Sequence, residues 1–317
     1  MSNESLRIVF MGTPDFAVAT LKTLVDAKYN IVGVITAPDK PAGRGRKLNE
    51  SAVKKYAQLE GLKILQPTNL KAESFLEELK SLEANLQIIV AFRMLPKVVW
   101  SMPKYGTFNL HASLLPNYRG AAPIHWAIIN GETKTGVTTF FIDEKIDTGA
   151  IILQDEIEIE ANETVGTLHD KLMVIGSELV LQTVGLIEKG DVKTQIQPKT
   201  ENLKTAYKLH KDNCKIDWTL PINDIYNKIR GLNPFPSAWS YLNNGNETLT
   251  VKLFKVKKEL EKHNLEIGTL ISDKNELKVA VSHGFIAIKE IQLPGKRKMD
   301  IKSLLNGYHF EENAKLL

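Results

Sequence analysis

Short apolar segments rich in β-branched residues alternate with segments of helical periodicity along the first half of the chain. This alternation constrains the fold more than any other feature, because helices that link successive strands across short loops make those strands run parallel. The predicted strands lie at 6–11, 30–36, 86–91 and 106–110, and the predicted helices at 15–27, 51–60 and 70–82. The sequence therefore predicts an α/β fold: a Rossmann-like, open and mostly parallel sheet with helices on both faces.

The pattern continues beyond Gly120 and changes near residue 190. Predicted next are a helix to about Asn130, antiparallel strands at 136–142 and 150–159 around a turn at 143–149, and a long apolar helix at 164–187. Residues 190–206 are polar, so we expect a linker there between a first domain over 1–189 and a C-terminal domain over 207–317. A helix at 222–229 followed by short alternating strands predicts a small, OB-like β-barrel in the C-terminal domain.

Cysteine usage and the lengths of the apolar runs limit the class of protein. Cys214 is the single cysteine, so no disulfide can form within the chain and a thiolate zinc site is not expected. Residues 1–5 lack the features of a secretory signal, and no apolar run approaches the ~20 residues of a membrane helix. We therefore expect a cytoplasmic protein with no membrane segment, in which Cys214 is a small buried apolar residue.

The net charge of +4 is unevenly distributed along the chain. Residues 203–317 hold 19 lysines and arginines against 13 aspartates and glutamates, whereas residues 1–202 hold 22 against 24. A basic C-terminal part is typical of a module that binds a polyanion. A lysine-rich solvated surface produces the same bias, so both interpretations stay open.

The turn after the first predicted strand, Gly12-Thr13-Pro14, also has two interpretations. It could be a phosphate-binding loop, yet it lacks both the dinucleotide fingerprint and the Walker pattern. A strand-to-helix turn with proline beside the first helical turn needs only local geometry to explain it. This turn argues against a nicotinamide-dependent dehydrogenase.

Asn109 and His111 are candidates for chemistry. They lie two residues apart at the end of a predicted strand, so their side chains point to the same side. There an amide could stabilise an oxyanion and an imidazole could accept a proton, although each residue type also occurs in purely structural roles. Ligands bind at the carboxyl ends of strands in open α/β sheets, and this favours a catalytic pair.

The segment 109–120, NLHASLLPNYRG, resembles the active-site segment of folate-dependent formyltransferases. In this family Asn-x-His and a later Asp-x-Gly form the catalytic trio, and the matching residues are Asn109, His111 and Asp147, with no departure. The resemblance implies that His111 takes the proton of an attacking amine, that Asn109 donates to the oxyanion, and that Asp147 orients His111 and favours its protonated form. By itself, the turn at 143–149 would equally be a plain acidic hairpin.

The resemblance also implies a pocket for 10-formyltetrahydrofolate as the formyl donor, and no metal. The side chains assigned to this pocket are Ser113, Leu114, Leu115 and Pro116 on one side, and Phe92 and Met94 on the other. Leucines suit a flat pterin, and proline fixes the loop. The sequence departs from the family at Arg93, where members commonly carry a small residue or glycine.

A basic loop at 36–48, TAPDKPAGRGRKL, is the third informative segment. By itself it could equally be an exposed flexible loop, but family members that act on methionyl-tRNA carry a very similar loop, which enters the acceptor end of the tRNA. The resemblance extends to 294–299. The side chains that it assigns to tRNA phosphate contacts are Lys40, Arg44, Arg46, Lys47, Lys296, Arg297 and Lys298.

Together these features predict an enzyme that transfers a formyl group from 10-formyltetrahydrofolate to the α-amine of initiator methionyl-tRNA, and we expect a monomer. Two alternatives differ in class. A related enzyme that formylates a sugar nucleotide or another small amine would need neither the basic loop nor the C-terminal barrel. An RNA-binding protein on a retired enzyme scaffold would not need the intact trio of Asn109, His111 and Asp147.

Overall fold

A computed structural model describes residues 5–42, 47–198 and 201–317, and the chain divides into two compact units. The first unit comprises Met1–Gly120, Gly136–Ile157 and His169–Thr205, and the second comprises Ala121–Thr135, Glu158–Leu168 and Ala206–Leu317. Two segments of the predicted first domain, 121–135 and 158–168, therefore pack with the C-terminal residues. The predicted domain limits stay a prediction, because compact packing does not test whether each part folds independently.

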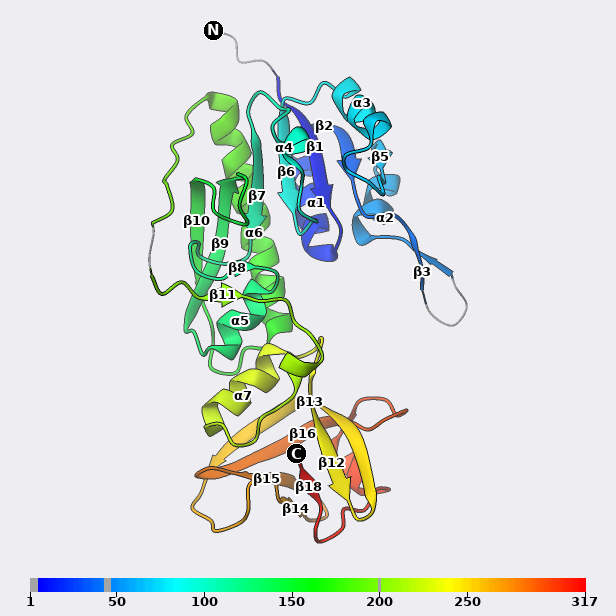
Figure 1. The fold of residues 1–317 in the computed structure, drawn as a ribbon, viewed down its shortest axis with the longest axis vertical. Helices are drawn as coiled ribbons and strands as arrows, with labels where there is room; N and C mark the ends of the chain where they lie inside the picture. Colours follow the sequence, from blue (N-terminus) through cyan, green and yellow to red (C-terminus); the bar gives the residue numbers. More distant parts are fainter. Residues whose placement is uncertain (1–4, 43–46, 199–200) are drawn as a thin grey trace. The chain divides into compact units, whose positions relative to one another are not determined.

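The first unit contains a seven-stranded sheet (Figure 1). Its spatial order is β10 (Ile151–Glu158), β9 (Lys134–Phe141), β7 (Thr107–His111), β6 (Leu86–Val90), β1 (Arg7–Gly12), β2 (Asn30–Ile35) and β5 (Ile64–Leu65). The five strands from β7 to β5 are parallel to their neighbours, and β9 is antiparallel to β7. The predicted open, mostly parallel sheet is therefore confirmed.

The predicted hairpin at the edge of this sheet is present. The N–H of Phe141 donates to the carbonyl oxygen of Ala150 beside the connecting loop. Further along the strands, Gly136 lies against the backbone of Asp155. This order of contacts is that of an antiparallel pair. Phe141 at the end of β9 is in register with Phe108 near the start of β7, so the 142–150 loop begins at the amino end of β7 and Asp147 approaches His111 along the face of the sheet.

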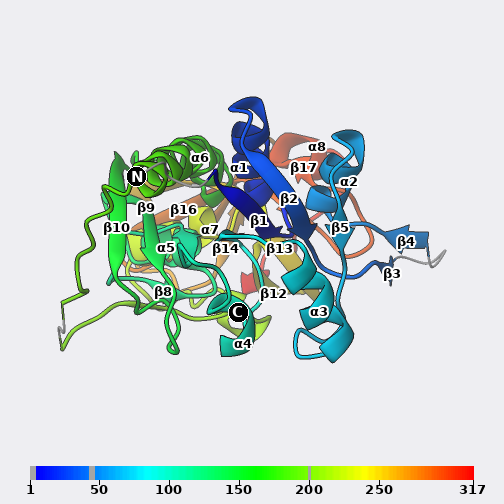
Figure 2. The same ribbon diagram turned by 90° about the horizontal axis from the view of Figure 1, so that it is seen from above.

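Helices cover both faces of the sheet, as predicted (Figure 2). They are α1 (Asp15–Asp26), α2 (Ala52–Leu59), α3 (Glu73–Ser81), α4 (Lys97–Trp100) and α6 (Val165–Lys189). Val9 and Met11 of β1 pack in one cluster with Phe75 and Leu79 of α3, whereas α1 and α6 lie on the other face. None of the helices in the described part of the chain is long and apolar enough to cross a membrane.

The second unit contains an antiparallel, nearly closed barrel. Its strands are β12 (Ala238–Asn244), β13 (Glu247–Leu260), β14 (Leu270–Ser272), β15 (Leu277–Val281), β16 (Gly284–Gln292), β17 (Met299–Asp300) and β18 (Lys315–Leu316). The order is β14-β15-β16-β13-β12-β18, and Leu316 N donates to Gly268 O at 2.9 Å between its two ends. A Cβ at position 268 would lie 2.3 Å from the Leu316 oxygen, so the barrel closes only around a glycine. The predicted small barrel is confirmed.

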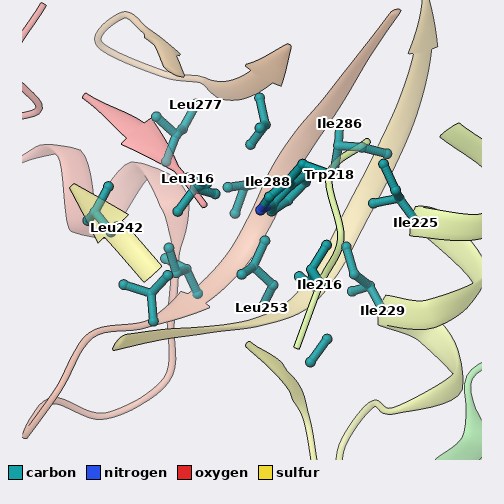
Figure 3. Close-up of a cluster of buried hydrophobic side chains, with 14 of the residues drawn as sticks. Ile216, Trp218, Ile225, Ile229, Leu242, Leu253, Leu277, Ile286, Ile288 and Leu316 are labelled. Atoms are coloured by element: carbon teal, nitrogen blue, oxygen red, sulfur yellow. The ribbon is translucent and has the colours of Figure 1, made fainter. Parts of the chain in front are cut away.

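The core of the second unit is formed by branched aliphatic side chains around Trp218 (Figure 3). Ile225 and Ile229 of α7 (Ile222–Gly231) are completely buried in it, and the indole N–H of Trp218 donates to Ser240 Oγ at 2.9 Å. Cys214 is buried in the same cluster, as expected, and burial raises the pKa of its thiol. The thiol is therefore a packing group at neutral pH.

Several short elements carry too few residues for a periodic pattern, and the sequence did not predict them. They are β3 (Lys40–Ala42), β4 (Lys47–Asn49), β5, α4, β8 (Arg119–Gly120), β11 (Thr205–Ala206), the 3-10 helix η1 (Asp212–Cys214), β17, α8 (Ile301–Leu305) and β18. Helix α5 (Pro123–Ile129), by contrast, follows Gly120 where the sequence predicts it.

Arg230 should be important for the stability of the second unit. Its guanidinium group, 8% exposed, donates to the carbonyl oxygens of Glu160 and Glu163 and to Asn227 Oδ1. Replacing Arg230 with Met removes these three hydrogen bonds at a buried position and should lower the free energy of unfolding by about 1–3 kcal/mol in urea titrations. The exposed Lys255→Met should be neutral, and equal unfolding midpoints for both variants would contradict this.

Candidate active site

The strands β6 and β7 end at the same edge of the sheet. The chain passes from β1 to β2 on one side and later returns to β6 on the other side of β1, so the strand order reverses between β1 and β6. Val90 at the end of β6 is in register with Leu110 of β7. Leu110 packs against Gly176 of α6, so Asn109 and His111 point to the opposite face. This places both side chains at the carboxyl edge of an open sheet, where ligands bind in such folds.

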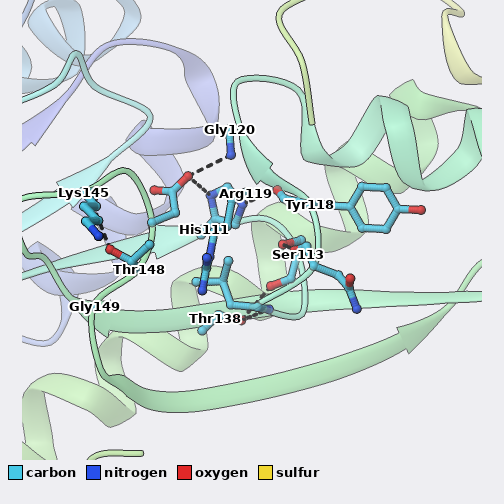
Figure 4. Close-up of polar contacts among 12 residues, drawn as sticks. His111, Ser113, Tyr118, Arg119, Gly120, Thr138, Lys145, Thr148 and Gly149 are labelled. Carbon is cyan, nitrogen blue, oxygen red and sulfur yellow. Dashed lines mark hydrogen bonds and ion pairs between the residues drawn. The ribbon is translucent and has the colours of Figure 1, made fainter. Parts of the chain in front are cut away.

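The carboxylate of Asp147 lies beside His111 and Gly120, and these two partners are labelled in Figure 4. Its Oδ2 atom is 3.7 Å from His111 Nδ1 and accepts a hydrogen bond of 2.9 Å from the backbone N–H of Gly120. The first distance is too long for a hydrogen bond and suits an ion pair with a protonated imidazole. The structure thus brings together two residues that are distant in the sequence, through a contact to Gly120.

His111 is 6% exposed, and its ring is fixed by a hydrogen bond at one nitrogen. Its Nε2 atom lies 2.8 Å from the backbone carbonyl oxygen of Tyr118. A carbonyl only accepts, so Nε2 carries a hydrogen, and the lone pair of a neutral imidazole is on Nδ1. The nitrogen that can take a proton is therefore the one that faces Asp147.

Asn109 differs from its neighbours in having an uncommitted side chain. It is half-buried, and its carboxamide has no hydrogen-bond partner within the described ranges, whereas the backbone of β7 is paired on both sides. A half-buried amide without a protein partner is available to a bound substrate. Asn109 can therefore donate to an oxygen atom of a ligand at this edge.

The loop that carries Asp147 is shaped by its own side chains. Asp143 Oδ1 accepts from the backbone N–H of Lys145 at 2.9 Å and from the Thr148 hydroxyl at 2.7 Å. Asp147 has a φ of +54°, in the left-handed region. Gly149 lies so close to Phe141 that a Cβ would be 1.7 Å from its carbonyl oxygen. The acidic turn predicted here therefore exists, with Asp143 closing it and Asp147 directed toward His111.

The backbone around this edge is strained at three places. Ala91, Tyr118 and Asp147 have φ values of +48°, +60° and +54°. Such conformations cost roughly 1–2 kcal/mol for residues other than glycine, and they concentrate at functional sites. Each of these residues lies in a segment that follows β6, β7 or β9, so the strain gathers where the candidate side chains converge.

The predicted folate loop at 113–116 is held by hydrogen bonds and apolar packing within the first unit. The Ser113 hydroxyl donates to Asn117 O at 2.7 Å, and Thr138 donates to Ser113 O at 2.6 Å (Figure 4). Leu115 packs against Phe140 in a local cluster. Ser113 and Leu115 are therefore committed to internal contacts, whereas Leu114 and Pro116 are half-buried and can face a ligand.

The other predicted side of the pocket follows β6. Phe92 is half-buried and Met94 is 66% exposed. Arg93 turns away to donate to the carbonyl oxygens of Pro67 and Thr68, with its guanidinium carbon 5.6 Å from the centre of the Phe92 ring. Arg93, at which the sequence departs from the family, therefore contacts the neighbouring loop and one predicted pocket residue.

Sequence reasoning missed polar residues that support these loops. Gln154 donates to Leu115 O at 3.0 Å and to Thr138 Oγ1 at 2.9 Å. Gln197 is 6% exposed and donates to the backbone of the 147–149 loop. Gln154 lies in a predicted strand and Gln197 in the predicted linker, and no sequence pattern marks either residue.

The basic loop begins as a short hairpin of β3 and β4. Lys40 is exposed, whereas Arg44, Arg46 and the side chain of Lys47 lie outside the described residues. Lys54 of α2 forms ion pairs with Asp39 and Glu50, which flank the hairpin on either side. The hydrogen bond from Lys54, supported by one from Gln66, lowers the pKa of Asp39, so the base of the hairpin is tied to α2 near neutral pH.

The three predicted cations near the C-terminus are not equivalent. Lys298 forms an ion pair of 2.8 Å with Glu290 and lies 5.3 Å from the centre of the Phe254 ring. Lys296 and Arg297 are exposed in the turn between β16 and β17. Of the three, Lys296 and Arg297 are thus the better placed for contact with a polyanion.

Gly149 should be essential for the position of Asp147. Gly149→Ala drives a methyl group into Phe141 O, so we expect a loss of at least about 1 kcal/mol in unfolding free energy and reduced enzymatic activity. A Cβ added at Gly185 of α6 would have no atom of the described chain within 4 Å, so Gly185→Ala should be neutral or stabilising. If both variants unfold at the same temperature, the close approach at Gly149 is not a constraint.

Comparison with known proteins identifies the family. Residues 6–184 match the family described as formyl transferase, and residues 208–309 match the formyl transferase C-terminal domain. The methionyl-tRNA formyltransferase of Flavobacterium johnsoniae is 62% identical over 313 residues, which cover 99% of each chain. That of Bacteroides thetaiotaomicron is 50% identical over the full length of both chains.

Solved structures extend the likeness to the fold. A sugar 3N-formyl transferase, determined in the presence of dTDP and 5-N-formyl-THF, aligns with a TM-score of 0.64 and 22% identity. The alignment covers 93% of this chain and 100% of that one. A likeness at this identity concerns the fold, whereas the matches in sequence span both units. The chain belongs to the formyl transferase family.

Proposed function

We propose that this chain transfers the formyl group of 10-formyltetrahydrofolate to the α-amino group of initiator methionyl-tRNA, for translation initiation in the cytoplasm, and that it does so as a monomer. The observation that carries the proposal is the group at the end of β7: the uncommitted amide of Asn109 on the same strand as His111, whose proton-accepting nitrogen faces Asp147. The full-length identity to curated methionyl-tRNA formyltransferases supports the choice of acceptor.

His111 serves as the general base. The reference pKa of an α-amine is about 7.7–8.0, and esterification to tRNA lowers it, so the nucleophile is largely neutral at cytoplasmic pH. As its nitrogen bonds to the formyl carbon, the amine proton passes to His111 Nδ1, which then lies in an ion pair with Asp147. The bond between formyl carbon and N10 breaks, and the proton from His111 leaves with N10.

Asn109 and Asp147 have separate roles in this proposal. The carboxamide of Asn109 donates a hydrogen bond to the formyl oxygen, on which negative charge develops during attack. Asp147 stabilises the positive charge that His111 acquires, and the Gly120 amide keeps the carboxylate in place. No step requires a metal ion.

The residues around the site fit a folate donor. The half-buried Leu114, Pro116 and Phe92 and the exposed Met94 follow the neighbouring strands β7 and β6. Apolar surface beside a few fixed polar groups is typical of sites for flat heteroaromatic ligands. The ion pair of 2.6 Å between Lys97 and Glu144 joins the segment after β6 to the loop of Asp147. We propose that these segments bind the pterin.

The acceptor class follows from the basic loop and from sequence identity. Because a sugar 3N-formyl transferase aligns over 93% of this chain, the second unit alone does not distinguish tRNA from a small amine. Lys40 at the start of the hairpin, and Arg44 and Arg46 within the loop, supply cations that a small substrate does not require. We propose that this loop and the cations Lys296 and Arg297 contact the tRNA backbone.

The direct test is mass analysis of methionyl-tRNA after incubation with the protein and 10-formyltetrahydrofolate. We expect a formylated α-amine, and no formylation of an amino sugar nucleotide under the same conditions. His111→Ala should lower the rate by about 10²–10⁴ and Asn109→Ala by about 10²–10³. The surface variant His309→Ala is the control. Near-normal rates in folded Asn109→Ala, His111→Ala and Asp147→Ala variants would refute the assignment.

Salt dependence tests the basic loop separately. Each phosphate contact adds roughly 0.7–0.9 to the slope of log affinity against log salt concentration, so Arg44→Ala should weaken tRNA binding and flatten the slope by about that amount. Folate affinity should be unchanged. The exposed Lys55→Ala, on the outer side of α2, is the matched control. A slope equal to that of the parent protein would remove the loop from the tRNA interface.

A further inference from the structure

We propose that Gln197 is a positioning residue for formyl transfer: its side chain holds the 147–149 backbone so that the Asp147 carboxylate faces His111. The inference rests on the proposed function, since it concerns the same site. It assigns a role in the reaction to a residue that lies beyond α6, in the stretch predicted as a linker. Four hydrogen bonds and the local backbone conformation support this role.

The carboxamide of Gln197 uses its full hydrogen-bonding capacity in one place. The nitrogen Nε2 donates to Asp147 O at 2.9 Å and to Gly149 O at 2.8 Å. The oxygen Oε1 accepts from Arg119 Nε at 3.1 Å and Nη2 at 2.6 Å. A buried amide whose nitrogen and oxygen are both hydrogen-bonded is held in one orientation. Gln197 therefore links the side chain of Arg119 to the backbone of the 147–149 loop.

The contacts fall where the loop most needs support. Asp147 has a φ of +54°, and such a conformation persists in a residue other than glycine only when its surroundings impose it. Gln197 binds the carbonyl oxygen of that residue, and the Gly120 N–H binds its carboxylate. With the Gln197 contacts removed, Asp147 is free to leave its left-handed conformation, and the accompanying change in φ would carry its carboxylate away from His111.

Gln197 is brought to the site by backbone pairing rather than by its own side chain. Two residues earlier, Gln195 exchanges two backbone hydrogen bonds of 2.8 Å with Ile151 of β10. The side chain of Gln195 is exposed, whereas that of Gln197 is buried. The chain thus supplies two glutamines in one segment, of which one contacts the loop and the other serves as a matched control.

Steady-state kinetics of Gln197→Ala and Gln195→Ala provide the first test. A displacement of about 1 Å in a catalytic group costs on the order of 10²-fold in rate, so kcat of Gln197→Ala should fall by at least about tenfold. The KM values for both substrates should change less than about threefold, because no substrate contact is lost. Gln195→Ala should match the parent protein. Gln197→Glu keeps the acceptor for Arg119 but loses both donors, and should resemble Gln197→Ala.

Hydrogen exchange provides a second test that does not depend on activity. In Gln197→Ala, the Gly120 amide should exchange faster, because its acceptor on Asp147 has moved, while the core amides of β1 and β6 stay protected. This readout distinguishes failure of the inference from failure of the proposed acceptor. Unchanged kcat, unchanged Gly120 exchange, or loss of protection throughout the first unit would each overturn the role of Gln197.

Discussion

The hydrogen bond between the Gly120 amide and the Asp147 carboxylate is the contact on which the site depends. It joins the segment after β7 to the loop after β9, and so places a carboxylate 3.7 Å from an imidazole that belongs to a different strand. Parallel strands that end together provide the edge, and this contact binds the carboxylate of the acid directly. The strained backbone at Tyr118 and Asp147 is consistent with a loop held by its partners rather than by its own preference.

Much of the fold follows from periodicity. The alternation of strands and helices predicted the sheet, and a spacing of two residues placed Asn109 and His111 on one side of β7. The sequence could not show that Asp147 approaches His111, because that depends on a tertiary hydrogen bond; only the family resemblance suggested it. Gln197 carried no signal at all, since one glutamine in a polar stretch resembles any other. The closure of the barrel at Gly268 was equally hidden, because it joins distant residues through backbone groups.

The family resemblance located the three candidate catalytic residues, but it says less about which neighbouring side chains face a ligand. Ser113 and Leu115 are committed to internal contacts, so the loop at 113–116 presents fewer side chains to a ligand than the motif suggests. Lys298 is similarly paired with Glu290. The proposed choice of tRNA as acceptor therefore depends on the basic loop and on sequence identity along the whole chain, because the fold is shared with a sugar 3N-formyl transferase. The ion pairs of Lys54 with Asp39 and Glu50 attach the base of the basic loop to α2.

The central claim is that the Asn109 amide, the His111 imidazole and the Asp147 carboxylate lie around the formyl carbon that is transferred. A crystal structure with a stable 10-formyl folate analogue tests it most directly. The account predicts the formyl oxygen about 3 Å from Asn109 Nδ2, with His111 Nδ1 and Asp147 on the side from which the amine attacks. A ligand bound with its formyl group remote from Asn109, or with Asp147 displaced from His111, would contradict the account.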